Sequence, residues 1–146
     1  MYKINGEELK VFLVHPGGPL FKNKDDGYWS IPKGLVEKDE DLLNTAIREF
    51  KEETGIEPVG KFDSLGCVKQ KSGKTIHAWS FEYLGDSEIK ILSNDFEIEW
   101  PPNSGRKQSF PEVDHGQFFS IKEAQLKISG AQSEFLDVLQ KKLKVK

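Results

Sequence analysis

The sequence predicts a mixed α/β domain in which helices pack on the faces of a central sheet. Short apolar runs typical of strands alternate irregularly with two substantial helical segments, one in the middle of the chain and one near its C-terminal end. That order of elements favours a mixed sheet covered by helices. The length of 146 residues is usual for one domain, and no repeat or linker divides the chain. We therefore expect a single domain over residues 1–146.

The composition is that of a globular protein without a broad basic surface. Hydrophobic residues make up 36% of the chain and charged residues 31%, and the large apolar side chains suffice for a core. The net charge of −3 argues against binding to nucleic acid polymers or acidic membranes, because such binding requires a basic surface. If the substrate is an anion, local cations or a bound metal must attract it.

Cysteine use and hydropathy lead us to expect a cytoplasmic location. The single cysteine, Cys67, cannot form an intrachain disulfide and is expected to be a small core residue on a strand. The first apolar run, residues 11–14, is too short for a signal peptide. No stretch approaches the ~18 apolar residues of a membrane span, so no membrane partner is expected.

The first half of the chain contains several strand candidates. The valine-rich run "LKVFLVH" (9–15) predicts a buried strand that "PGG" ends, and "YWSIP" (28–32) predicts a second, short strand. Farther along, "SLGCVKQ" and "TIHAWSFEYL" flank "KSGK". This arrangement predicts a hairpin that turns near Ser72-Gly73.

The second half begins with a strand and ends with a helix. "FEIEW" (96–100) alternates and predicts a strand, whereas "PPNSGRKQSFP" (101–111) is expected to be a loop because its prolines and polar residues leave no period. "EVDHGQFFSI" then leads to a last helical region, which Ser120 is placed to cap. In that region four apolar side chains recur at helical spacing and predict one apolar face. They are Phe135, Val138, Leu139 and Leu143.

The middle of the chain, residues 39–54, predicts an amphipathic helix. Apolar residues at i, i+3, i+4 and i+7 form one face. They are Leu43, Ala46, Ile47 and Phe50. Asp39 is placed to cap the N-terminus of this helix, and Gly55 is placed to end it.

Three carboxylates, those of Glu49, Glu52 and Glu53, crowd the end of this helix. Like charges four residues apart cost ~0.2–0.5 kcal/mol per pair, and the helix dipole adds ~0.3–1 kcal/mol for each acid in the last turns. Lys51 is expected to point away from them. The cluster is open to two interpretations, a solvated charged face or a divalent-metal site, and a local conflict of this kind is typical of function. Oxygen ligands without cysteine or clustered histidine would favour Mg²⁺, with Mn²⁺ as a substitute.

The same stretch resembles the signature of the Nudix hydrolases. That signature is a glycine, five residues, a glutamate, seven residues, Arg-Glu, an apolar residue, any residue, Glu-Glu, any residue, glycine and an apolar residue. Every fixed position is present, namely Gly34, Glu40, Arg48, Glu49, Phe50, Glu52, Glu53, Gly55 and Ile56. The resemblance implies an α/β/α sandwich with a central mixed sheet.

The resemblance also implies a reaction, the hydrolysis of a pyrophosphate bond in a nucleoside diphosphate linked to a further group. A polyphosphate repels an attacking water, so Mg²⁺ is needed to neutralise charge and orient the substrate. The implied metal ligands are the carboxylates of Glu49, Glu52 and Glu53 and the backbone carbonyl of Gly34. Arg48 and Glu40 are implied to support the site, with Arg48 paired to an acid of the motif.

Two further residues are candidates by the same resemblance. "WSIPKG" resembles the corresponding stretch of dinucleoside polyphosphate hydrolases, so Lys33 either contacts a phosphate or is a solvated loop lysine. Family members often place a glutamate from a downstream loop near the metals, which makes Glu112 a candidate general base. Otherwise Glu112 is an ordinary exposed residue and Glu52 is the next candidate for the base.

Aromatic and basic residues outside the signature complete the set of candidates. Trp100 is a candidate for stacking on a nucleobase, and Arg106 and Lys107 are candidates for contacts with phosphates. Specificity usually resides in loops of this kind. Trp29 is expected in the core. His15 and His77 are each expected to be packed or hydrogen-bonded rather than catalytic.

Three functions are compatible with these residues. The first is a Mg²⁺-dependent pyrophosphohydrolase acting on nucleoside triphosphates or dinucleoside polyphosphates. The second is a hydrolase of ADP-ribose or nucleotide sugars, and the third is a non-catalytic nucleotide-sensing domain. The intact signature argues against the third, because a sensor has no need to keep metal ligands. The oligomeric state stays open.

Overall fold

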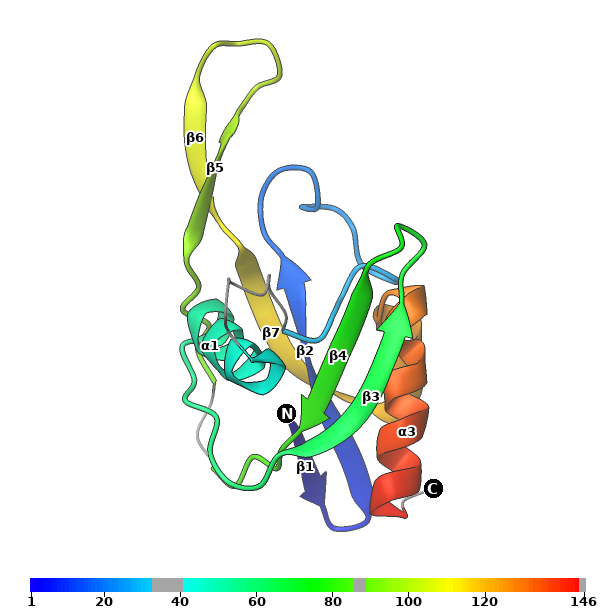
Figure 1. The fold of residues 1–146 in the computed structure, drawn as a ribbon. Coiled ribbons are helices and arrows are strands. Elements are labelled where there is room, and N and C mark those ends of the chain that lie inside the picture. The colour runs from blue at the N-terminus through cyan, green and yellow to red at the C-terminus, as the bar shows by residue number, and fades with distance from the viewer. Residues whose placement is uncertain (33–40, 86–88, 145–146) are drawn as a thin grey trace.

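Strand β2 (Glu8–Pro16) is the centre of the fold and is buried on both faces in this computed structural model, which describes residues 1–32, 41–85 and 89–144. Its side chains from Val11 to Val14 are each 4% exposed or less. Because side chains alternate across a strand, such a run requires a packing layer on either side. β2 pairs antiparallel with β1 (Tyr2–Asn5) and with β7 (Val113–Ser120), as Figure 1 shows.

One face of this sheet is covered by the C-terminal helices α2 (Ile121–Lys127) and α3 (Ser133–Leu143), with the short turn η1 (Gly130–Gln132) between them. Trp29 is part of this core, as expected. The buried cluster consists of Leu9, Val11, Leu13, Trp29, Phe119, Ala124, Ile128, Leu136 and Leu139. The predicted cap at Ser120 is confirmed, since its hydroxyl accepts a hydrogen bond from the Glu123 backbone N–H. The last helix thus buries its apolar face on the sheet.

The opposite face is covered by helix α1 (Leu42–Thr54) and by residues 89–92. Phe12 and Val14 of β2 are buried on this side, against Ile91 among others. On α1, Phe50 packs edge-on against Phe81 with ring centroids 5.2 Å apart. Helices therefore lie on both faces of the sheet, which confirms the predicted α/β/α sandwich.

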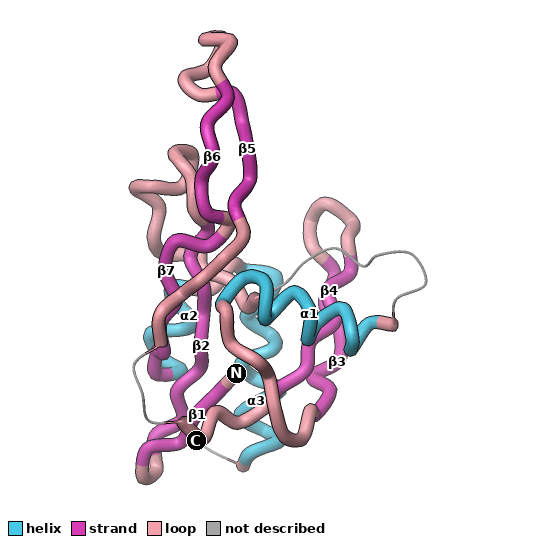
Figure 2. Tube along the Cα trace, turned by 90° about the vertical axis from the view of Figure 1, so that its left-hand side faces the viewer, coloured by secondary structure: helices cyan, strands magenta, loops and turns pink. Residues whose placement is uncertain are grey.

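A second pair of strands, β3 (Asp63–Lys69) and β4 (Thr75–Ser80), forms the predicted hairpin, and Gly73 lies in its turn. The segment after β4 pairs in parallel with β1, because the Tyr2 backbone N–H donates to the Phe81 carbonyl at 3.0 Å. The sheet is thereby mixed, as predicted. In Figure 2, α1 runs across the side that faces the viewer, and it contacts both β4 and β7.

The expected burial of Cys67 is wrong. Cys67 does lie on a strand, β3, but its side chain is exposed. Its neighbour Val68 points the other way and is buried against Ala78 and Phe135. The face of β3 that carries Val68 packs against α3, whereas Cys67 lies on the opposite face of the strand and stays in solvent.

The loop expected over residues 101–111 is only partly a loop. Its second half forms β6 (Lys107–Pro111), which pairs antiparallel with β5 (Asp95–Glu99). Phe110 lies opposite Phe96 with ring centroids 6.2 Å apart. This cross-strand pairing stabilises a strand that the local sequence pattern does not indicate. The two strands form an arm that projects from the body of the protein (Figure 1).

Two local expectations also need correction. Residues 28–32 do not form a strand, because Ser30 bridges only to Val14 and Trp29 only to Ile128, on different neighbours. Helix α1 is capped not by Asp39, which lies outside the described residues, but by Asp41. The Asp41 carboxylate accepts hydrogen bonds from the backbone N–H groups of Leu43 and Asn44. None of the described helices has the length and apolar character needed to cross a membrane.

The double burial of β2 can be tested with matched leucine substitutions. Leu13 is 0% exposed, whereas Leu84 is 85% exposed. Leu13→Ala removes buried methyl groups and leaves a cavity, so it should lower the free energy of unfolding by about 2–5 kcal/mol in urea titrations. Leu84→Ala should change it by no more than about 0.5 kcal/mol. Equal effects of the two substitutions would contradict the central position of β2.

Candidate active site

The carboxyl-terminal end of α1 is held by a close crossing of the chain. Gly55 ends the helix with φ 75°, and its backbone N–H donates to the Lys51 carbonyl at 2.8 Å. A Cβ at Gly55 would lie 2.9 Å from the Cβ of Leu92. Glycine is therefore needed here both for the left-handed conformation and for the approach of the neighbouring segment.

Arg48 lies between two of the three clustered acids. Its Nη1 atom is 2.8 Å from Glu49 Oε1 and 3.2 Å from Glu52 Oε2. The pairing of Arg48 with acids of the signature is therefore present, as the resemblance implied. Lys51 points away, as expected, and pairs with Glu57 at 2.8 Å. One guanidinium thus offsets part of the repulsion that the sequence concentrates at this helix end.

Glu49 is more enclosed than Glu52, with 13% of its side chain exposed, against 38% for Glu52. Burial raises its pKa above the ordinary value for glutamate, although Arg48 acts in the opposite direction. The negative charges of Glu52 and Glu112 raise this pKa further. Glu112 therefore lies close enough to the helix to act on Glu49, although more than fifty residues separate the two along the chain.

A cleft of about 680 Å³ brings Glu53 and Glu112 together between α1, β4 and the ends of β2 and β7. This volume is in the range of small-molecule sites. Polar and aromatic side chains of the β3–β4 hairpin complete the wall, among them Gln70, Lys74, Thr75, His77 and Trp79. Sequence reasoning missed Lys74 and Trp79 as site residues. The available signal was the lysine at the predicted turn and the alternation of side chains along the strand that follows it.

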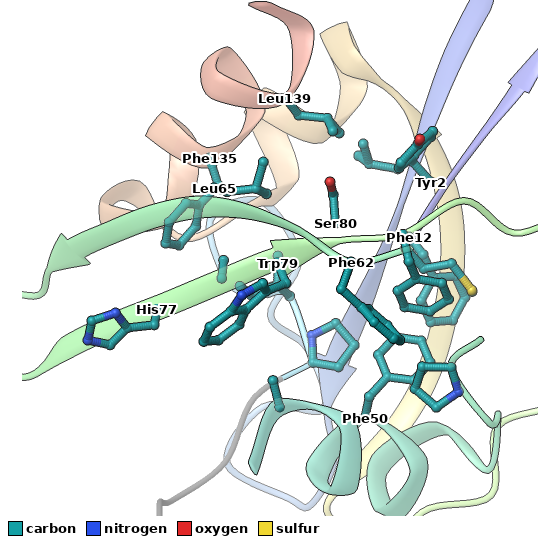
Figure 3. A pocket seen from close by; sticks show the side chains of 18 of the residues that line it. Tyr2, Phe12, Phe50, Phe62, Leu65, His77, Trp79, Ser80, Phe135 and Leu139 are labelled. Atoms are coloured by element: carbon teal, nitrogen blue, oxygen red, sulfur yellow. The ribbon is translucent and has the colours of Figure 1, made fainter. Parts of the chain in front are cut away.

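A second, apolar cavity of about 90 Å³ adjoins the cleft. Four residues line both spaces, namely Pro32, Ala46, His77 and Trp79. Figure 3 shows His77 and Trp79 on β4, with Phe50 of α1 across the cavity from Trp79. The smaller cavity has no carboxylate in its wall, so the cleft with Glu53 and Glu112 is the candidate active site.

Other predicted site residues lie elsewhere. Trp100, Arg106 and Lys107 lie at the far end of the β5–β6 arm and are not among the residues that line the cleft. Trp100 is half-buried within the arm, not against the central sheet. Lys33 and Gly34, like Glu40, lie outside the described residues.

His15 and His77 differ in their exposure to solvent. His15 is buried as expected, with Nδ1 2.9 Å from Asp114 Oδ1 and Nε2 2.6 Å from the Lys24 carbonyl oxygen. It also packs edge-on against Trp29. His77 is exposed, so the expectation that it would be packed is wrong. Its side chain borders the cleft.

The carboxylates fit a divalent cation by their chemistry. Within residues 1–32, 41–85 and 89–144, no three or more acidic, histidine or cysteine side chains converge closely enough to hold a metal ion. One expected ligand, the Gly34 carbonyl, lies outside those ranges. Carboxylate oxygens are nevertheless the ligands that Mg²⁺ prefers.

The raised pKa of Glu49 predicts how stability depends on pH. The folded protein binds a proton at this site more tightly than the unfolded chain does, so the free energy of unfolding falls as pH rises through the window between the two pKa values. That window begins at about pH 4, the ordinary pKa of glutamate. In EDTA, Glu49→Gln should therefore resist urea better than the wild type at pH 7 but not at pH 4.

The exposed Glu97 of the arm offers the matched control, because Glu97→Gln should leave the urea midpoint unchanged at both pH values. A stability gain of Glu49→Gln that is the same at pH 4 and pH 7 would contradict the assignment of a raised pKa to Glu49.

Comparison with known proteins places this geometry in a family. The model of the NUDIX domain matches residues 1–139. The rat bis(5'-nucleosyl)-tetraphosphatase is 36% identical over 90 residues, which are 56% of this chain and 61% of that protein. An RNA pyrophosphohydrolase of Rhodopseudomonas palustris is 29% identical over 118 residues, which are 75% of this chain and 66% of that protein. The chain thus aligns with less than two thirds of the length of either relative.

Solved structures agree on the fold. A Caenorhabditis elegans Ap4A hydrolase in a binary complex superposes with a TM-score of 0.71 at 17% identity, covering 98% of this chain and 93% of that one. The NUDIX domain of Shewanella oneidensis NrtR in complex with ADP ribose superposes with a TM-score of 0.65 at 16% identity, covering 97% and 82%. The family match over nearly the whole chain agrees with the signature on α1 and with the sandwich around it. The chain belongs to the Nudix domain family.

Proposed function

We propose that this protein hydrolyses a pyrophosphate bond in a nucleoside polyphosphate, in a reaction that depends on Mg²⁺. The observation that carries the proposal is the meeting of the acidic end of α1 with Glu112 at one cleft of about 680 Å³. Membership of the Nudix family supports the reaction class. Nucleoside triphosphates and dinucleoside polyphosphates are the proposed substrates, since a relative is named as a bis(5'-nucleosyl)-tetraphosphatase.

In this proposal the acids of α1 hold the cation. Glu49, Glu52 and Glu53 would supply carboxylate oxygens and Gly34 its backbone carbonyl. When bound, Mg²⁺ would neutralise phosphate charge and acidify the attacking water; Mn²⁺ is the proposed substitute. Arg48 keeps Glu49 and Glu52 in place through its two ion pairs.

Glu112 is the proposed general base. In the reaction a water oxygen bonds to phosphorus, the bridging P–O bond breaks towards the leaving phosphate, and the base takes the proton of the water. Glu112 lines the cleft, is exposed, and acts electrostatically on Glu49. Glu52 is the alternative base, although its Oε2 atom is already paired with Arg48 at 3.2 Å.

The walls of the cleft are suited to the rest of the substrate. Lys74 carries a positive charge at the rim and Trp79 an aromatic face, which together match a phosphate chain and an attached nucleoside. Lys33, at the start of the signature, is proposed as a further phosphate contact. Arg106 and Lys107 lie on the arm, and we propose that they meet phosphates of a substrate that extends beyond the cleft.

A second candidate activity is hydrolysis of ADP-ribose. It is favoured by the fold shared with a NUDIX domain solved with ADP ribose. A panel of diadenosine tetraphosphate, ATP, ADP-ribose and 5′-triphosphorylated RNA, each assayed with Mg²⁺ and with EDTA, separates the possibilities. We expect turnover of the first two that EDTA abolishes. Tight binding without turnover of any member would instead indicate a nucleotide-sensing domain.

Glu53→Gln tests the metal assignment. The change keeps size and helix propensity but removes one anionic oxygen, so kcat at saturating Mg²⁺ should fall by ~10²-fold or more. Folding should be intact or slightly improved, because repulsion on α1 is relieved. The matched control is Glu57→Gln, whose carboxylate pairs with Lys51 away from the cluster and should leave kcat unchanged. Full activity of Glu53→Gln would exclude Glu53 as a ligand.

Trp100→Ala tests whether the arm binds a nucleobase by stacking. A stacked base contributes ~1–3 kcal/mol, so KM for diadenosine tetraphosphate should rise at least ~5-fold while kcat changes little. KM for ATP should change less, since the shorter nucleotide has no second base to reach the arm. Tyr28→Ala, which also removes a partly exposed aromatic ring, serves as the control. Equal KM values for wild type and Trp100→Ala with both substrates would remove Trp100 from the site.

A further inference from the structure

Residues 92–94 connect the end of α1 to the start of β7. The backbone N–H of Leu92 donates to the Thr54 carbonyl at 3.3 Å, and that of Asn94 donates to the Glu52 carbonyl at 3.2 Å. Carbonyls in the last turn of a helix lack partners within the helix, so this segment satisfies two of them. The bridge segment, as we name residues 92–94, is thereby anchored on the helix that carries the acidic cluster.

The same segment anchors the backbone of Glu112. The Glu112 N–H donates to the Asn94 carbonyl at 2.8 Å, and the Glu112 carbonyl accepts from the Gly17 N–H at 2.9 Å. Two hydrogen bonds through Asn94 therefore connect Glu112 to Glu52. Gly17 fits only without a side chain, because a Cβ there would lie 1.9 Å from the Pro111 carbonyl oxygen.

Ser93 is the one member of the bridge segment that acts through its side chain. Its Oγ accepts a hydrogen bond from the Val113 N–H at 3.2 Å and can donate to the Val113 carbonyl at 3.0 Å, with the Asn94 carbonyl as an alternative acceptor at 3.1 Å. β7 is the edge strand of its sheet, and Val113 is its first residue. The hydroxyl thus takes the place of a neighbouring strand there.

Val113 is buried, at 4% exposure, whereas Glu112 beside it is exposed. Because Glu112 is exposed, the region that its carboxylate can reach depends on where its backbone lies. The position of the Glu112 backbone depends in turn on Val113, the next residue. The backbone N–H and carbonyl of Val113 are both hydrogen-bonded to the Ser93 hydroxyl.

From this geometry we infer that Ser93 is a positioning residue for Glu112, which it holds at the cleft that Glu53 of α1 also lines. The inference rests on the proposed function, in which Glu112 is the general base. Ser93 contacts no substrate in this account, because it is not among the residues that line the cleft. Its whole effect on the reaction passes through the carboxylate of Glu112.

The first experiment compares Ser93→Ala, Ser93→Thr and the control Ser133→Ala with diadenosine tetraphosphate and Mg²⁺. Ser133, at the start of α3, donates a hydrogen bond from its hydroxyl to the Gly130 carbonyl at 2.8 Å. Ser133→Ala therefore removes the same kind of hydrogen bond as Ser93→Ala, but at a site away from the cleft. We expect Ser93→Ala to lower kcat by ~10-fold or more with KM within ~2-fold. Ser93→Thr, which keeps the hydroxyl, should restore kcat, and Ser133→Ala should leave it unchanged.

The second experiment is a double-mutant cycle with Glu112→Gln. If Ser93 acts only through Glu112, Ser93→Ala should lower kcat no further in the Glu112→Gln background. The inference would be overturned if Ser93→Ala lowered kcat by the same factor in both backgrounds. It would also be overturned if Ser93→Ala left kcat unchanged while Glu112→Gln lowered it. The proposed function would survive either result. An unchanged kcat of Glu112→Gln would overturn both the role of the base and the inference. If Ser93→Ala does not fold, Ser93→Cys, of similar size and with weaker hydrogen bonds, takes its place in the cycle.

Discussion

The fold depends on one strand, β2, having no face that water can reach. Its apolar side chains require α2 and α3 on one side and α1 with residues 89–92 on the other. That requirement brings the signature helix against the sheet. The chain therefore carries its charged cluster on a helix whose orientation is fixed by hydrophobic burial, and the cluster needs no stabilising contribution of its own.

At the end of α1, unfavourable electrostatics are combined with stabilising backbone hydrogen bonds. Burial and neighbouring carboxylates raise the pKa of Glu49, so this end of the helix costs free energy at neutral pH. The cost is tolerated because the Arg48 ion pairs offset part of it and because the bridge segment satisfies carbonyls of the last turn. A local cost of this kind, stabilised from elsewhere in the fold, is what functional sites commonly show.

Local patterns predicted the elements that depend on local order. The helical period gave the mid-chain and C-terminal helices, and the turn residues gave the β3–β4 hairpin. They did not predict β6, because its pairing with β5 is decided across the arm, nor the exposure of Cys67, because the sequence does not say which strand face meets a helix. For the site, the acids of α1 were visible as a charge conflict, whereas Lys74 and Trp79 enter the cleft only through tertiary packing.

The exposed thiol of Cys67 has a practical consequence. It is the single cysteine of the chain, and it lies on β3, whose partner strand β4 borders the cleft. A maleimide-linked fluorophore or a nitroxide spin label would therefore attach at one defined position without prior mutagenesis. From there it could report changes in the surroundings of the hairpin while nucleotide and metal are added. The same thiol makes a reducing agent advisable during purification, because two copies of the chain could otherwise become covalently joined.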